Sequence, residues 1–97
     1  MEYFEENINQ NNIIEIWCEE KGRKSNTYIH GWNIEDSLLK DHLKIIKKNK
    51  GCNGVIKELL KETGKIKVMM LQGNHKDYVY NYIQSTGIDE NLIKIKL

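Results

Sequence analysis

The stretch that constrains this chain most is residues 40–54, which read KDHLKIIKKNKGCNG. At about 100° per residue, the apolar side chains of this stretch and the two leucines before it fall on one arc of a helix. The members of that arc are Leu38, Leu39, His42, Leu43, Ile45 and Ile46. The opposite arc holds four lysines, Lys40, Lys44, Lys47 and Lys48. The pattern predicts a helix that buries one face in a core and presents a cationic face to its surroundings.

Two helices and five strands are expected, separated by glycine-containing turns. The first helix, about residues 34–49, ends before Gly51 because glycine tolerates the positive φ of a sharp exit. Asn33 or Asp36 is expected to cap its start. Alternating and β-branched residues predict strands at 13–20, 26–32, 55–60, 66–72 and 92–97, and a second helix covers about 74–86.

The order of these elements is β-β-α-β-β-α-β. Each amphipathic helix needs an apolar surface, and one face of a sheet can provide it for both. The expected fold class is therefore α/β, of the α+β type: a two-layer sandwich with two helices on one face of a mixed sheet of about five strands, the other face being partly open. Residues 13–97 are expected to form this domain, and the polar, acidic residues 1–12 to be a flexible tail.

Charge is distributed unevenly along the chain, although the formal net charge is only +1. Residues 1–20 carry six glutamates and no basic residue, whereas residues 21–97 carry all 15 lysine and arginine residues against eight acidic ones. A basic body favours a polyanionic partner. Lysine is frequent here, as are isoleucine and asparagine, but that abundance does not explain why the lysines cluster.

Several classes of protein are disfavoured by the sequence. No apolar run is long enough to cross a bilayer and no signal peptide opens the chain, so a soluble, cytoplasmic protein is expected. The protein is also expected to be a monomer. Cys18 and Cys52 are isolated, and with three scattered histidines they form no metal-binding pattern, so neither a metal nor a cofactor is expected. No Ser/His/Asp, Cys/His or paired-carboxylate set stands out, so catalysis is not expected.

Two cationic segments are candidates for contact with a polyanion. The first is the tip of the first hairpin, Lys21, Gly22, Arg23 and Lys24, where the chain's single arginine suits phosphate or base edges. The second is the lysine face of the first helix. The alternative for each is an ordinary solvated turn or a solvated helix face.

A third candidate is Asn74, His75 and Lys76, at the start of the second helix, where free N–H groups favour an anion. The alternative is that Asn74 caps the helix and His75 packs over its core face. His42 lies within the apolar arc, so it is expected to be a core or edge histidine and not a ligand. Tyr78 and Tyr80 are expected to be exposed.

Three segments, in this order and spacing, resemble the eukaryotic translation initiation factor 1 family, which also has archaeal and bacterial relatives. They are Gly22-Arg23-Lys24 with Thr27 and Gly31, the lysine helix running into Cys52-Asn53-Gly54, and Leu71-Gln72-Gly73 followed by Asn74-His75-Lys76. The similarity covers roughly residues 13–97. The chain departs from the family pattern at Asn74, where aspartate is usual, and at Lys50, near which an aromatic residue is common.

The resemblance implies a non-enzymatic factor that binds the small ribosomal subunit near the initiator tRNA site and promotes scanning and accurate start-codon selection. Implied partners are ribosomal RNA, the initiator tRNA region and other initiation factors, and the loop at Arg23 is implied to approach the RNA. An alternative is an RNA-binding module of the same fold in reinitiation or recycling. A remote alternative is a small acylphosphatase-like hydrolase, for which Arg23 and Asn26 are the only candidate residues.

Overall fold

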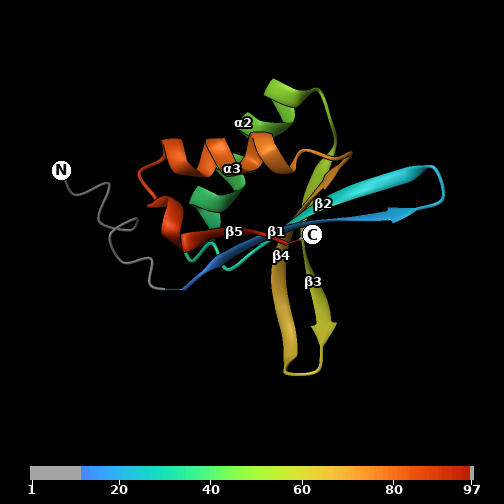
Figure 1. Ribbon diagram of the computed structural model, residues 1–97, viewed down its shortest axis with the longest axis horizontal. Coiled ribbons are helices and arrows are strands. Elements are labelled where there is room, and N and C mark those ends of the chain that lie inside the picture. The colour runs from blue at the N-terminus through green and yellow to red at the C-terminus, as the bar shows by residue number, and fades with distance from the viewer. Residues whose placement is uncertain (1–11, 97) are drawn as a thin grey trace.

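The structure is a computed structural model that describes residues 12–96 (Figure 1). Its elements are β1 (Ile14–Lys21), β2 (Lys24–His30), α2 (Asp36–Lys50), β3 (Gly54–Lys61), β4 (Gly64–Gln72), α3 (Lys76–Ser85), the 3-10 helix η2 (Glu90–Leu92) and β5 (Ile93–Ile95). The predicted order β-β-α-β-β-α-β is confirmed.

The expected acidic tail lies, except for Asn12, outside the described residues. Within the described part of the chain, no helix combines the length and apolarity that crossing a membrane requires.

The five strands form one mixed sheet in the order β3-β4-β2-β1-β5, which confirms the predicted fold class. The pairs β1–β2, β2–β4 and β3–β4 are antiparallel, and β5 runs parallel to β1. Two of these pairs are hairpins closed by two-residue turns, with Lys21 opposite Lys24 and Lys61 opposite Gly64. Because the turns are so short, the paired strands continue to the end of each hairpin, and both hairpins project from the body of the protein (Figure 1).

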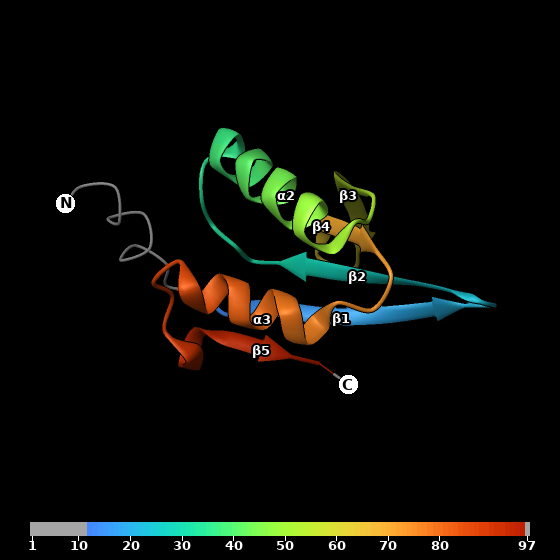
Figure 2. The same cartoon turned by 90° about the horizontal axis from the view of Figure 1, so that it is seen from above.

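Both helices cover the same face of the sheet, as Figures 1 and 2 show. α2 buries Leu39, Leu43 and Ile46, and α3 buries Val79 and Ile83. These side chains pack on the strand residues Ile14, Ile16, Ile29, Met69, Leu71 and Ile93. Burying one such aliphatic side chain contributes roughly 1.5–3 kcal/mol, so the two helices are held to the sheet mainly by this core.

The predicted buried arc of the first helix is wrong at one position. Ile45 is 45% exposed, because the sheet contacts only the stripe formed by Leu39, Leu43 and Ile46. The prediction for Tyr78 and Tyr80 is also wrong, since both are partly buried and pack against the core.

The ends of three elements also differ from the prediction. The N-cap residue of α2 is Glu35, which makes no side-chain capping bond, and Asp36 instead pairs with Lys67 of β4. α3 begins at Lys76 and not at Asn74. Leu92, the first residue of the last predicted strand, belongs to η2 instead. The Asp89 carboxylate caps η2 by accepting a hydrogen bond from the Asn91 N–H at 2.9 Å.

Candidate nucleic-acid interface

The tip of the β1–β2 hairpin extends away from the helices (Figure 1). Gly22 has φ 66° and Arg23 does not have a positive φ, a pattern that suits a type II′ turn. Lys21, Arg23 and Lys24 are all exposed. The turn therefore presents three cationic side chains at the end of a projection, as the sequence predicts.

The lysine face of α2 is exposed at Lys40, Lys44 and Lys48, whereas Lys47 is half-buried. The last turn of the helix holds Lys47, Lys48 and Lys50, where the helix dipole favours cations. Lys40 lies about 12 Å further back along the helix axis than Lys48, at 1.5 Å per residue. The four lysines share a face, but the density of positive charge is highest at the C-terminal end.

The third segment, the loop between β4 and α3, is fastened to β2. The Gly73 N–H donates to the Ser25 carbonyl at 2.7 Å. The Thr27 hydroxyl, which is fully buried, donates to the Gly73 carbonyl at 2.6 Å and accepts from the His75 N–H at 2.8 Å. Loop and hairpin are thus one unit, and Thr27 has a role that sequence reasoning did not assign to it.

His75 lies at the start of α3, but its ring does not pack over the core face of the helix, as one of the two predictions had it. It occupies the N-cap position of α3, and its ring turns back so that Nε2 lies 2.7 Å from the Gln72 carbonyl oxygen. This ring covers Gly73, where a Cβ would lie 2.7 Å from Nε2. Asn74 is not the cap residue, although its side-chain oxygen lies 3.4 Å from the Lys76 N–H.

The turn after α2 joins the same loop from the other side. The Gln72 N–H donates to the Asn53 carbonyl at 2.9 Å, and the Asn53 side-chain amide lies 3.4 Å from the Gln72 side-chain oxygen. Gly54 is closely surrounded, since a Cβ there would lie 2.8 Å from a Leu71 methyl and 2.9 Å from the Met70 carbonyl oxygen. The segments around Thr27, Asn53 and Gln72 therefore meet at one end of the sheet.

The C-terminal end of α2 lies beside the N-terminal end of α3 (Figure 2). The Asn49 amide donates to the Tyr78 hydroxyl at 2.8 Å, and the Lys50 ammonium lies 5.0 Å from the centre of the Tyr78 ring. Between the helix ends is an open groove of about 490 Å³, lined by Lys50, Asn74, His75, Lys76, Asp77, Tyr78 and Ile95. Lys50 was missed as a candidate residue, although the basic run before Gly51 was a signal for it.

The predicted histidine at the edge of the core is confirmed. His42 stacks on Trp32 with ring centres 4.7 Å apart, and its Nδ1 lies 2.8 Å from the Tyr82 hydroxyl oxygen. Partial burial raises the pKa of the Tyr82 hydroxyl, so this group stays a neutral hydrogen-bonding partner. The cluster joins the two helices.

Taken together, the fold and these charges define a small two-layer α/β protein whose motif segments converge at one cationic end. The family model for translation initiation factor SUI1 matches residues 10–89. The chain therefore belongs to this family, and the resemblance found in the sequence is confirmed. No curated protein matches the chain at a significant level.

Proposed function

We propose that this protein is a translation initiation factor that binds the small ribosomal subunit near the initiator tRNA site and promotes scanning and accurate start-codon selection. The observation that carries the proposal is the convergence of three motif segments, joined through Thr27 and Gln72, in a chain of the SUI1 family. Ribosomal RNA, the initiator tRNA region and companion initiation factors are the proposed partners, and the cytoplasm is the proposed location.

The contact residues proposed for the RNA fall into three groups. The hairpin group is Lys21, Gly22, Arg23 and Lys24, the helix group is Lys40, Lys44, Lys47 and Lys48, and the loop group is Asn74, His75 and Lys76. To these the groove between the helix ends adds Lys50. Cations carried by hydrogen-bonded elements can hold phosphates without rearranging the fold, and each phosphate contact releases counterions.

The proposed mechanism is a competition that involves no bond-making. A hairpin that projects from the body can enter a cleft that a flat surface cannot reach, and full seating of the initiator tRNA would then compete with it. Only a correctly paired start codon would supply enough free energy to displace the factor. A factor held mainly by phosphate contacts suits this role because it can be bound tightly enough to be present and loosely enough to leave.

Co-sedimentation with purified small ribosomal subunits tests the binding step. We expect binding to weaken steeply with added salt, and to weaken further in the double variant Arg23→Glu with Lys24→Glu. The matched control is Lys57→Glu with Lys65→Glu, which makes the same change of charge on exposed lysines of the β3–β4 hairpin. If neither salt nor the Arg23/Lys24 variant changes binding, the assignment of the hairpin is wrong.

A reporter that compares AUG with near-cognate start codons tests the selection step. If the protein selects start codons, the Arg23/Lys24 variant should raise initiation at near-cognate codons relative to AUG. A module for reinitiation or recycling would instead change the use of a second reading frame and leave that ratio unaltered. A response of the start-codon reporter therefore indicates start-codon selection, and a response of the second-frame reporter indicates reinitiation or recycling.

A further inference from the structure

We infer that the helix-free face of the sheet carries a second binding site, which takes single-stranded RNA by stacking a base on Trp17. Residues on this face alternate with the buried core residues of β1 and β2, so they point away from α2 and α3. The site lies on the opposite side of the sheet from the helices and does not rest on the proposed function.

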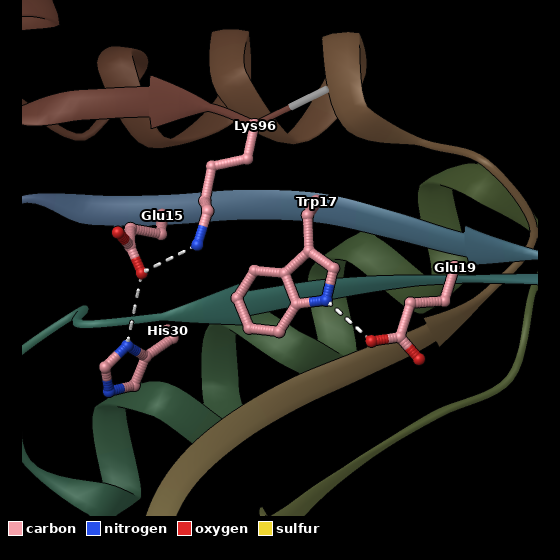
Figure 3. A network of polar contacts seen from close by, with 5 residues as sticks. All are labelled: Glu15, Trp17, Glu19, His30 and Lys96. Atoms are coloured by element: carbon pink, nitrogen blue, oxygen red, sulfur yellow. Dashed lines mark hydrogen bonds and ion pairs between the residues drawn. The ribbon is translucent and has the colours of Figure 1, made fainter. Parts of the chain in front are cut away.

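The centre of the site is a platform of two stacked aromatic rings. Trp17 and Tyr28 face each other across β1 and β2, with ring centres 5.4 Å apart and planes inclined by 16°. Tyr28 is 8% exposed, whereas Trp17 is only partly buried. The Trp17 Nε1–H donates to the Glu19 carboxylate at 3.0 Å, which fixes the orientation of the ring (Figure 3). One indole face is thus covered by Tyr28 and the ring is held in place, as a stacking surface requires.

Two ammonium groups lie over the same indole ring. The Lys61 and Lys96 Nζ atoms are each 5.5 Å from the ring centre of Trp17. They come from opposite edges of the sheet, β3 and the residue after β5, and the Lys96 N–H is anchored to the Ile16 carbonyl at 2.8 Å. Both side chains are long and solvent-exposed, so they can move aside for a base and then hold the phosphates on either side of it.

Three carboxylates line the groove: Glu15 and Glu19 have partners beside Trp17, and Glu62 lies exposed in the turn between β3 and β4. Figure 3 shows Glu15 between two partners, His30 Nδ1 at 3.8 Å and Lys96 Nζ at 3.7 Å, while Glu19 accepts from Trp17. The Lys96 ammonium partly compensates the charge of Glu15, and the two carboxylates position Lys96 and the indole.

The platform opens into a groove that is large enough for a nucleotide. It has a volume of about 1000 Å³ and lies between the sheet face and the end of the β3–β4 hairpin, with Leu60, Lys61 and Ile66 on the hairpin side. Side chains alternate between the two faces of the sheet, so Lys21 of β1 and Lys24 of β2 lie on the same face as Trp17 and Tyr28, four residues closer to the turn. An extended strand that starts on Trp17 therefore runs toward the cationic hairpin tip. Aromatic rings flanked by cations recognise single strands, whose bases are free to stack.

Fluorescence of Trp17 tests the site directly. The chain has two tryptophans, and Trp32→Phe leaves Trp17 as the only tryptophan, which can be excited selectively over the five tyrosines. This change costs no hydrogen bond within the described residues, because Trp32 Nε1 has no partner there. Short oligouridylate and oligoadenylate strands should quench Trp17 in a saturable way, whereas their duplex should not, since paired bases cannot stack on the ring.

Two sets of variants assign the contacts. The variants at Trp17 remove its emission, so their binding is followed by the anisotropy of a dye-labelled oligouridylate. Trp17→Leu should weaken single-strand binding by about tenfold or more, and Trp17→Tyr should restore part of it. Lys61→Ala with Lys96→Ala should lower the slope of log K against log salt by about 1.4, since each phosphate contact contributes about 0.7. Lys57→Ala with Lys65→Ala removes the same charge from exposed lysines that do not line the groove, so it should leave Trp17 quenching unchanged.

The proposal is overturned if the single strands leave Trp17 fluorescence unaltered, or if a folded Trp17→Leu variant binds them as tightly as the parent chain. It is also overturned if a peptide rich in glutamate and tyrosine quenches Trp17 while the oligonucleotides do not, because the groove then belongs to a protein partner. The proposed function is contradicted by a different result, namely that the protein does not bind the small ribosomal subunit. If oligonucleotides quench Trp17 but the protein does not bind small subunits, the proposed function is wrong and the binding site at Trp17 is supported.

Discussion

Thr27 and His75 are 48 residues apart in the sequence, yet a hydrogen bond of 2.8 Å joins the Thr27 hydroxyl oxygen to the His75 N–H. The same hydroxyl donates to the Gly73 carbonyl at 2.6 Å. A single buried side chain thus satisfies two backbone groups of the loop before α3. Because the loop and the β1–β2 hairpin both hold proposed RNA contacts, this side chain fixes how the two are placed relative to each other.

Replacing Thr27 with valine keeps the shape of the side chain and removes the hydroxyl. The Gly73 carbonyl and the His75 N–H then lose their partner, and we expect the free energy of unfolding to fall by about 1–3 kcal/mol. Urea denaturation measures the loss. Thr27→Ser keeps the hydroxyl and is the control; it should lose clearly less. Equal losses in the two variants would mean that packing, and not the hydrogen bonds, determines the contribution of this residue.

Replacing Gly54 with alanine tests the close packing between the turn after α2 and β4. The new methyl group would lie 2.9 Å from the Met70 carbonyl oxygen and 3.0 Å from a Leu43 methyl, so β3 must shift. Overpacking of this kind costs about 1–3 kcal/mol of stability. Val55→Ala changes the neighbouring side chain, which is 43% exposed, and should cost about 0.5 kcal/mol or less. Thermal melting of the two variants compares them.

The sequence predicted the elements of the fold well because local patterns determine them. The period of the lysine helix gives both its buried stripe and its cationic face, and Gly22 marks the hairpin turn. Ile45 shows the limit of this reasoning: it lies at the edge of the apolar arc, and only the position of the sheet decides which edge is covered.

The candidate site was predictable only in part, for a related reason. Exposed lysines and the arginine can be recognised one by one from their local sequence. The bonds of Thr27 to the β4–α3 loop cannot, because they depend on the pairing of β2 with β4. The proximity of Lys50 to Tyr78 likewise depends on how the two helices lie on the sheet. The stacking of Trp17 on Tyr28 follows from the register of β1 and β2, which the sequence alone did not fix.

The ion pair between Asp36 and Lys67 ties the start of α2 to β4 and makes a prediction about pH. The hydrogen bond and the charge of Lys67 lower the pKa of the Asp36 carboxyl below its usual value of 3.8. The pair therefore stabilises the folded state above that usual value, and this contribution is lost as the pH falls through the lowered pKa. In Lys67→Ala the pKa of Asp36 should rise, as followed by NMR titration of the carboxyl carbon. Added salt should reduce the difference in the Asp36 pKa between the parent chain and Lys67→Ala, because the ion pair is solvent-exposed and its charges are screened.

Replacing Asn74 with aspartate should stabilise the start of α3. The Asn74 side-chain oxygen lies 3.4 Å from the Lys76 N–H, which is long for a hydrogen bond. A carboxylate there would accept more strongly and would interact favourably with the positive end of the helix dipole, so Asn74→Asp should raise the free energy of unfolding by about 0.3–1 kcal/mol. Asn81→Asp places the same charge on an exposed residue in the middle of α3 and should give no gain. If both variants melt at the temperature of the parent chain, the oxygen at position 74 does not support the helix.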